Sequence, residues 1–241
     1  MDLWLPPAKP AIIRTHKEAS FLPGMFPGGA AAVGTPTLSY VTTTFSTTDQ
    51  TNYSFAGTSI GAAEGTRRVF VAVHSLQGGI SSVTPTSVTI GGVSATSHVT
   101  IADLNTRVSI WSALVPTGTT ATIDVVFSTN QNCVHIGVWA GYKLSDSSPT
   151  GTAQDAASAT PSLSVATTGD CIIIAAGSTT GAGASGVAVF TGVTERYDTF
   201  NGDIITASAG DISAFAGSSP TNVTITYTGT STRASAAVSW R

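Results

Sequence analysis

The chain has 241 residues and a net charge of −3, and only 10% of its residues are charged, against 39 Thr and 29 Ser. This length suits one large all-β domain, and 41% hydrophobic residues are enough to fill a core. Basic residues do not cluster beyond the pair Arg67–Arg68, so we expect no nucleic-acid partner, which would need many cations on one face. No apolar stretch approaches the roughly 20 residues of a membrane-spanning helix, so we expect no membrane partner.

The first 35 residues differ from everything that follows. They hold five of the eleven prolines and three of the ten basic residues, within "WLPPAKPAIIRTHKEASFLPGMFPGG". Prolines remove backbone donors and restrict the preceding residue, so neither a long helix nor a central strand is expected. The segment also carries large apolar side chains, which a free linker would not hold: Leu3, Trp4, Leu5, Ile12, Ile13, Phe21, Leu22, Met25 and Phe26. We therefore predict an extended docking arm that binds another surface.

From residue 36 onward the pattern is typical of β-strands. The run "RRVFVAVHSL" predicts a strand buried on both faces, and "TSVTIGGVSA" predicts a hairpin with a type I′ turn at Gly91–Gly92. In "ATIDVVFST", Ile123, Val125 and Phe127 alternate with polar neighbours and are expected to face inward. Later strand-like segments are "LSVATTGDCIIIAAGS", "GVAVFTGV", "DIITASAG", "NVTITYTG" and "RASAAVSWR".

These signals together predict the fold class. Strand patterns recur about every 10 to 15 residues between Gly, Pro, Ser and Asn, which favours an all-β, antiparallel β-sandwich, with a jelly-roll as the best match for this size. The domains expected are the arm, 1–35, and a sandwich, 36–241. The polar stretch near 145–160 is a candidate subdivision: one continuous sandwich is favoured, and two stacked small sandwiches are the alternative. Within it, "GTAQDAASA" (151–159) is expected to form one helical turn.

Two short motifs match catalytic or cofactor patterns. "GTSIG" places Ser59 in a G-x-S-x-G pattern, but "AAEGTRR" after it is too short and glycine-broken for the helix that a nucleophile elbow needs. "GAGASG" (181–186) fits G-x-G-x-x-G, but the strand-like "VAVFTGV" follows where a dinucleotide site needs a helix. We therefore predict no catalytic residue and no cofactor, and a hydrolase based on Ser59 ranks third among the functions considered.

Metal and disulfide chemistry have equally little support. The four histidines, His16, His74, His98 and His135, stand singly, and Asp198 and Asp203 offer too few oxygens for calcium, so no metal is expected. Cys133 and Cys171 are too few for a disulfide scaffold. We expect buried free thiols, with a disulfide between Cys133 and Cys171 as the alternative.

Aromatic residues raise one further alternative. Sugars stack on exposed aromatic faces, and Trp111 and Trp139 lie in strand-like segments where either exposure or burial fits the pattern. A receptor- or glycan-binding adhesin that uses these two residues to hold a host surface glycan is therefore the second functional hypothesis.

The N-terminal segment carries a family resemblance. Its "PPAKPAII" followed by "PGMFPG", within residues 4–28, resembles the short Pro-rich N-termini of structural proteins of tailed bacteriophages, particularly small virion proteins encoded among head and tail genes. The rest of the chain is similar in texture to phage β-sandwich proteins. The resemblance implies a non-enzymatic virion component of the neck, collar or tail, or a capsid decoration protein, made in the host bacterial cytoplasm.

That resemblance also implies partners. Such proteins embed an extended arm in a neighbouring virion protein, project a β-sandwich and form symmetric homo-oligomers. In this hypothesis two basic residues, Arg14 and Lys17, meet acidic groups of the partner. The apolar anchors that fill its pockets are Trp4, Leu5, Ile12, Ile13, Phe21 and Phe26.

Overall fold

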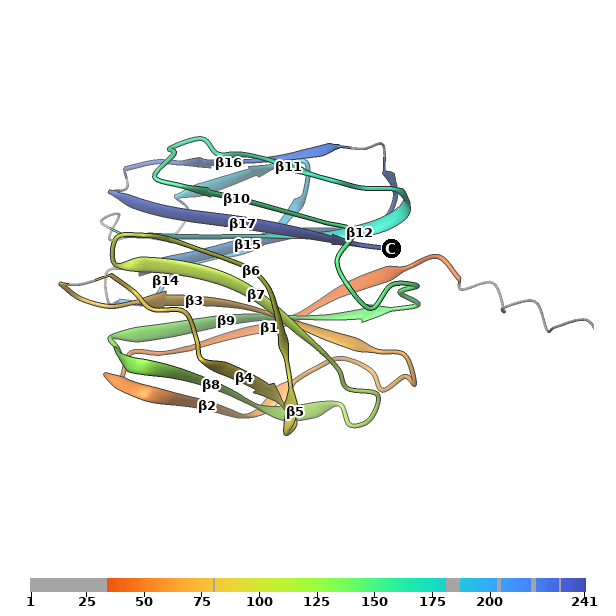
Figure 1. Ribbon diagram of the computed structural model, residues 1–241, viewed down its shortest axis with the longest axis horizontal. Helices are drawn as coiled ribbons and strands as arrows, with labels where there is room; N and C mark the ends of the chain where they lie inside the picture. Colours follow the sequence, from red (N-terminus) through yellow and green to blue (C-terminus); the bar gives the residue numbers. More distant parts are fainter. Residues whose placement is uncertain (1–33, 80, 181–186, 203–204, 218–219, 230) are drawn as a thin grey trace, which may run out of the picture. The chain divides into compact units, whose positions relative to one another are not determined.

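The protein's fold is known from a computed structural model that describes residues 34–79, 81–180, 187–202, 205–217, 220–229 and 231–241 (Figure 1). Residues 1–33 of the predicted docking arm, with all its anchor residues, lie outside these ranges. The described chain forms seventeen β-strands, and none of its residues is in a helix. All strand pairs are antiparallel, so the predicted all-β, antiparallel sandwich class is confirmed.

The first half of the chain forms two sheets. The first inner sheet has the order β1 (Thr37–Ser46), β9 (Cys133–Tyr142), β3 (Arg68–Leu76), β7 (Thr106–Leu114) and β6 (Thr96–Asp103). The first outer sheet has the order β2 (Gln50–Ser59), β8 (Thr120–Gln131), β4 (Ser87–Ile90) and β5 (Val93–Ser94).

Two further sheets come from the second half. The second inner sheet has the order β10 (Gly151–Ala156), β17 (Thr232–Trp240), β12 (Gly169–Thr180), β15 (Ile205–Gly217) and β14 (Thr194–Phe200). The second outer sheet has the order β11 (Ser162–Val165), β16 (Thr221–Tyr227) and β13 (Ala188–Thr191).

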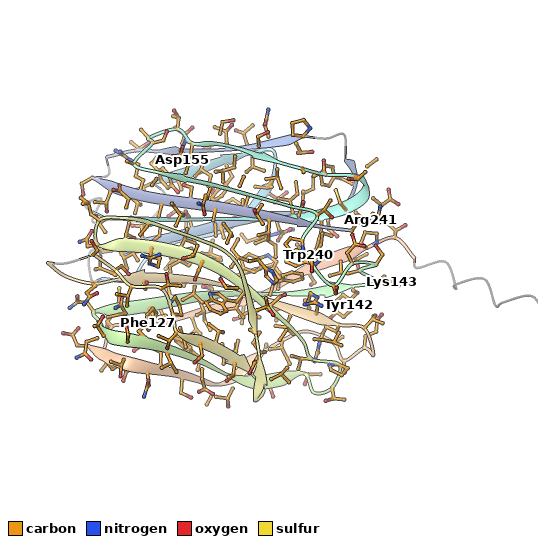
Figure 2. The ribbon with its side chains drawn as sticks, viewed as in Figure 1. Phe127, Tyr142, Lys143, Asp155, Trp240 and Arg241 are labelled. Carbon is orange, nitrogen blue, oxygen red and sulfur yellow. The ribbon has the colours of Figure 1, made fainter. Side chains whose placement is uncertain are left out.

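The four sheets pack as successive layers, outer, inner, inner and outer (Figure 1). Val71, Ile123 and Val125 belong to the core between the first two layers, and Ile173 and Ile225 to the core between the last two. A third apolar cluster joins the two inner sheets, with the rings of Phe70 and Trp240 4.8 Å apart (Trp240 is labelled in Figure 2). We call this contact between the inner sheets the central interface. Because it covers their second faces, central strands of the inner sheets such as β3, β9 and β12 are buried on both sides, as "RRVFVAVHSL" predicted for β3.

The two halves of the chain share one strand order. In the inner sheets, β1-β9-β3-β7-β6 corresponds to β10-β17-β12-β15-β14, and in the outer sheets β2-β8-β4 corresponds to β11-β16-β13. The side chains follow the same pattern: Ile123 and Val125 are buried on β8, and Val223 and Ile225 are buried on β16. The chain is therefore a tandem repeat of one sandwich topology. Equivalent sheets of the two repeats face each other, as they do in an isologous dimer.

Several local predictions can now be judged. Gly91 and Gly92 have φ of 59° and 79° and join β4 to β5, so the predicted hairpin is confirmed. The helical turn expected in 151–159 is wrong, because Gly151–Ala156 pairs with β17 as strand β10. Residues Val33–Arg241 form one compact unit that contains four sheets rather than the two of a simple sandwich, and the connection between β9 and β10 overlaps the polar stretch near 145–160.

Arg67 holds the loops at one end of the first sandwich. Its side chain is fully buried and donates hydrogen bonds to four main-chain carbonyl oxygens: Val115 (2.8 Å), Gly61 (2.7 Å), Gly118 (2.9 Å) and Thr117 (2.7 Å). Carbonyl dipoles thus solvate this guanidinium in place of water. The side chain consequently fixes the segment before β3 against the segment between β7 and β8.

Candidate functional site

The central interface contains a group of three buried aromatic polar side chains. His74 on β3 and His135 on β9 are cross-strand partners. Tyr197, from β14 of the other inner sheet, reaches both: its hydroxyl lies 2.9 Å from His74 Nε2, and its ring stacks on that of His135 with 5.4 Å between centroids. On the far side of His135, the Thr43 hydroxyl contacts Nε2. The group therefore joins β1, β3 and β9 of one sandwich to β14 of the other.

Gly137 makes room for Tyr197. A Cβ atom at this position of β9 would lie 2.2 Å from the hydroxyl oxygen and 2.6 Å from a ring carbon of Tyr197. Real carbon atoms do not approach that closely, so a side chain at residue 137 would displace the tyrosine. The glycine is thus required by a close approach between the two sandwiches.

Burial keeps all three groups neutral near pH 7. It lowers the pKa of His135 to about 4, and it lowers the pKa of His74 well below its usual value, with a further contribution from the neighbouring His135. Burial also raises the pKa of Tyr197 well above its ordinary value, helped by nearby Tyr40. Neutral imidazoles can be buried beside a phenol without a counter-ion, which is what packing two sheets together requires.

A buried carboxylate, that of Asp211, also connects the two sandwiches. Asp211 on β15 has a fully buried side chain and accepts 2.7 Å hydrogen bonds at Oδ2 from Trp139 Nε1 and from Arg196 Nε. Arg196 Nη2 also donates to Oδ1 at 2.9 Å, which makes the ion pair bidentate. Since Trp139 belongs to one sandwich and Asp211 to the other, this contact also crosses the central interface.

Hydroxyl and main-chain groups close the other end of the central interface. Thr106 and Ser178 hydroxyls lie 2.7 Å apart, and the Arg233 amide donates to Asp103 Oδ2 at 2.8 Å. Several polar groups of one sandwich are thus bonded to polar groups of the other. The chemistry of the layer is therefore that of a specific permanent junction between two sheets.

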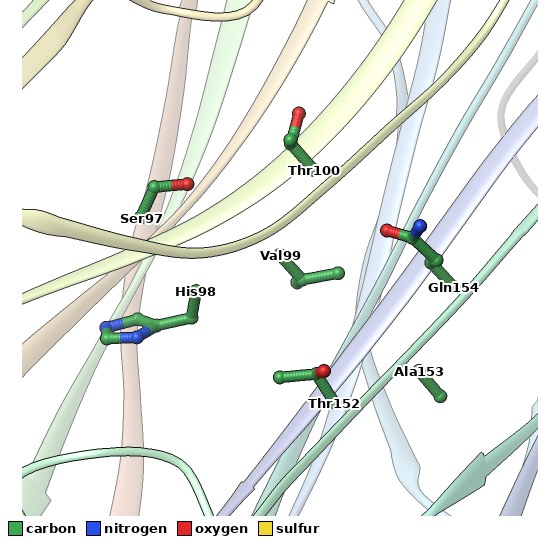
Figure 3. Close-up of a pocket in the computed structure, with 7 residues that line it drawn as sticks. All are labelled: Ser97, His98, Val99, Thr100, Thr152, Ala153 and Gln154. Atoms are coloured by element: carbon green, nitrogen blue, oxygen red, sulfur yellow. The ribbon is translucent and has the colours of Figure 1, made fainter.

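A groove opens where the central interface reaches one flank of the molecule (Figure 3). It has a volume of about 500 Å³ and lies between β6 and β10, the end strands of the two inner sheets. We call it the edge groove. Its lining residues are mostly small: Ser97, His98, Val99, Thr100, Thr152, Ala153 and Gln154.

His98 lies at an irregularity of the edge strand. The register of β6 against β7 shifts between Ser97 and Val99, which leaves His98 as the extra residue of a bulge. Its Nε2 lies 2.8 Å from the Ser112 hydroxyl, and its ring meets the ring of Trp240 edge to face at 4.6 Å. Burial, with the nearby Arg68 cation, lowers the pKa of His98 to about 4. The bulge thus turns the imidazole into the groove wall as a neutral packing group.

The two tryptophans considered for glycan binding do not lie on the surface. Trp139 is fully buried in the central interface, and Trp111 is 6% exposed in the first sandwich core, where its Nε1 donates to the Ser109 hydroxyl at 2.8 Å. Neither ring has a free face on which a sugar could stack. The prediction of a glycan contact at Trp111 and Trp139 is therefore wrong, because the inner sheet that carries both residues is covered on both faces.

Both cysteines are buried free thiols, as expected, and the alternative disulfide is wrong. Cys133 packs with Leu76 and Ile205, and Ile205 pairs with Thr180 at the end of β12. Cys171 lies nine residues earlier on β12, about 30 Å away at the rise of a β-strand. Disulfide bonding needs Cα atoms within about 7 Å, so the two thiols cannot meet.

The remaining candidates do not combine into a site. Ser59 is exposed at the end of β2, and the residues that follow it form no helix, as the sequence indicated. Asp198 accepts a 2.6 Å hydrogen bond from the Ala188 amide, while Asp203 and the "GAGASG" segment lie outside the described residues. In the described part of the chain, no group of three His, Cys, Asp or Glu side chains is placed to hold a metal ion. A helix long and apolar enough to cross a membrane is likewise absent from it.

Sequence reasoning missed the contacts that join the two sandwiches. His74 and His135 were interpreted as solitary, because their adjacency depends on the register of β3 against β9, which no local pattern encodes. Tyr197, Asp211 and Arg67 carried no motif at all. The one available signal was the double-sided burial expected for β3, which requires a second layer over that sheet.

Comparison with known protein families and with curated proteins gives no match to this chain.

Proposed function

We propose that this protein is a non-enzymatic structural component of a tailed-phage virion, anchored to neighbouring virion proteins by residues 1–35 and projecting its paired sandwiches. The neck, collar or tail is the first proposed location, and the capsid surface, as a decoration protein, is the second. The observation that carries the proposal is the contrast between an arm rich in proline and large apolar residues and a body whose two sandwiches are joined by specific polar contacts such as Trp139–Asp211.

The strand order supports a finer classification, in which each half is a jelly-roll. In the first half, β1 pairs with β9 and β3 lies between β9 and β7, while the facing sheet runs β2-β8-β4-β5, so consecutive strands repeatedly change sheets. The second half repeats this order with one fewer strand in its outer sheet. Jelly-rolls are found in viral capsid proteins and lectins, which makes a virion role chemically and architecturally reasonable.

Composition supports assembly with other subunits. Few charged residues means that few ions lose hydration when surfaces meet, so close contacts form at low cost. Large apolar residues that are exposed on the body lie on different strands and turns, such as Phe45, Leu104 and Val189. The highest density of candidate apolar anchors in the sequence is therefore in the arm, where prolines also reduce the entropy lost on docking.

Deleting residues 1–34 tests the anchoring role. The truncated protein should keep a β-type circular dichroism spectrum, since strand β1 begins at Thr37, but it should no longer join purified particles that take up the full chain. Normal incorporation of the truncated protein would refute the proposal.

A full-length pair of variants sharpens this test. Replacing Ile12 and Ile13 together by Asp should prevent particle association, because the anchors would have to bury carboxylates. Replacing Arg14 and Lys17 together by Gln is the matched control for a change in the same segment. This change should weaken association without abolishing it, and the loss should be larger at low salt than at high salt, where the charges are screened.

A further inference from the structure

The edge groove is bordered by two sheet edges at once. In the part of the chain that the structure describes, β6 pairs only with β7 and β10 pairs only with β17, so each presents one unpaired side. An edge strand with unpaired N–H and C=O groups is a template for another strand. Here the two edges lie next to each other with an open groove between them (Figure 3).

We propose that this groove accepts residues 11–22 of the arm of a second copy of this chain, which adds there as an extended β-strand. The proposal rests on the docking function of the arm and names the surface that receives it. Main-chain hydrogen bonds to a sheet edge would provide affinity, and the groove would select the side chains that face it.

The arm sequence is suited to strand addition at this segment. Residues 11–22 form the longest stretch of the arm between prolines, from Pro10 to Pro23, so each of these residues has the N–H group that a sheet requires. Its beginning, "AIIRT", is rich in β-branched residues. In an extended conformation one side presents Ala11, Ile13 and Thr15, followed by Lys17, Ala19 and Phe21, and its first three residues suit a groove lined mostly by small side chains. The middle of the other side carries Arg14, His16 and Glu18. The twelve residues also exceed the eight of β6 and the six of β10.

Among the described residues, the opposite flank of the inner sheets carries large aromatic side chains. There the end strands are β1 and β14, and the Tyr40 ring lies 5.6 Å from the ring of Trp139 and 6.0 Å from that of Tyr197. Large aromatic groups therefore fill the position that Ser97, Thr100 and Thr152 leave open at the edge groove. This difference between the flanks singles out the β6–β10 side as the acceptor.

A second copy is favoured over the same chain by the position of β1. The described chain begins just before β1, which lies at the opposite edge of the first inner sheet from β6, with three strands between them. Exchange between copies places donor and acceptor on different flanks. Such a contact is heterologous, and it forms a ring when the rotation between subunits closes.

Disulfide trapping in the full-length protein tests this contact. One copy carries Thr15→Cys and a differently tagged copy carries Thr152→Cys, while the native Cys133 and Cys171 are fully buried and should not compete. Thr152 is exposed and lines the groove. We expect a mixed disulfide in about tenfold higher yield than from Thr15→Cys paired with Val189→Cys, because docking raises the effective concentration of the two thiols. Val189 is 59% exposed on β13, away from the groove, and serves as the control position.

Equal yields at the two positions would overturn the proposal. A cross-link that forms only within a chain carrying both Thr15→Cys and Thr152→Cys would also overturn it, because the arm would then bind its own body.

A groove-filling variant provides an independent measurement. Gln154 is exposed, so Gln154→Trp should fill the groove without disturbing a core, and it should abolish both the cross-link and self-association measured by light scattering. Val189→Trp is the matched control and should leave both unchanged. Self-association that survives Gln154→Trp would contradict the assigned acceptor. Copies that cross-link as expected but never join virions would refute the proposed function alone, whereas arm-dependent virion association without any cross-link would refute the groove alone.

Discussion

Acidification should weaken the central interface through His135. Burial lowers the pKa of this residue to about 4 in the folded protein, against about 6.5 in an unfolded chain. Above pH 6.5 the imidazole is neutral in both states, so the folded state loses nothing. As the pH falls through 6.5, the unfolded chain takes up a proton that the folded protein resists, and stability declines until the folded state is also protonated near pH 4.

The size of the effect follows from the pKa difference. A shift of about 2.5 units corresponds to roughly 3.4 kcal/mol when the titration is complete, and to about 2 kcal/mol between pH 8 and pH 5. His74 adds to the loss with the same sign, because burial and the adjacent His135 also lower its pKa. Tyr197, whose pKa burial raises well above its ordinary value, stays neutral between these two pH values.

Urea unfolding at pH 8 and pH 5 measures this loss. The wild-type protein is compared with His135→Gln, which has a polar group to meet the Thr43 hydroxyl but does not titrate. The variant should be less stable at pH 8, since it replaces a stacked ring, but its loss between pH 8 and pH 5 should be about 2 kcal/mol smaller. If both proteins lose the same free energy of unfolding, His135 is not the group whose protonation destabilises the fold.

Three further changes probe the packing. Gly137→Ala should lower the free energy of unfolding by about 2 kcal/mol or more in urea, because the new Cβ would overlap Tyr197. Gly65→Ala is the control and should be nearly neutral, because a Cβ there meets no atom within 4 Å. Equal effects of the two substitutions would contradict the close approach between Gly137 and Tyr197. Arg67→Met should lower the free energy of unfolding by about 3 kcal/mol, because four carbonyl groups lose their hydrogen-bond donor. Arg68 is half-buried, and Arg68→Met should cost less than about 1 kcal/mol. The reverse order would show that the hydrogen bonds of Arg67 do not stabilise the fold. A thiol reagent should leave Cys133 and Cys171 unreacted in the native protein and should label both after denaturation. Fewer than two reactive thiols in the denatured, unreduced protein would contradict the assignment of free thiols.

The sequence predicted those parts of the fold that depend on local pattern. Alternation in "ATIDVVFST" correctly placed Ile123, Val125 and Phe127 in a core, and two glycines correctly located the β4–β5 turn. The segment 151–156 does not read as a strand in the sequence, because it alternates between small and polar residues, which carry little hydrophobic contrast. Its identity as a strand comes from pairing with β17, some 80 residues later, and such tertiary pairing overrides local preference.

The candidate sites were harder to predict for a related reason. The sequence leaves both exposure and burial open for Trp111 and Trp139, because a strand in a single sandwich has one face toward solvent and one toward the core. Trp111 faces the core of its own sandwich, and Trp139 faces the second sandwich, which covers it, so the two rings are buried in different cores. The polar contacts between the sandwiches are also invisible in sequence, since each of them joins residues on strands far apart in the chain, such as His74 and Tyr197.

The tandem repeat links this packing to the proposed assembly. Two separate sandwiches that met through equivalent sheets would form a closed dimer, and fusing them in one chain makes that contact independent of concentration. The polar pairs that cross the central interface, such as Trp139 with Asp211, fix one arrangement of the two repeats. With this pair of faces already occupied, further assembly must use the remaining surfaces, and unpaired sheet edges are the surfaces on which a strand from another copy can be added. The edge groove between β6 and β10 exists only because two repeats are packed together, so the same duplication that closes one interface creates the acceptor we propose for the next.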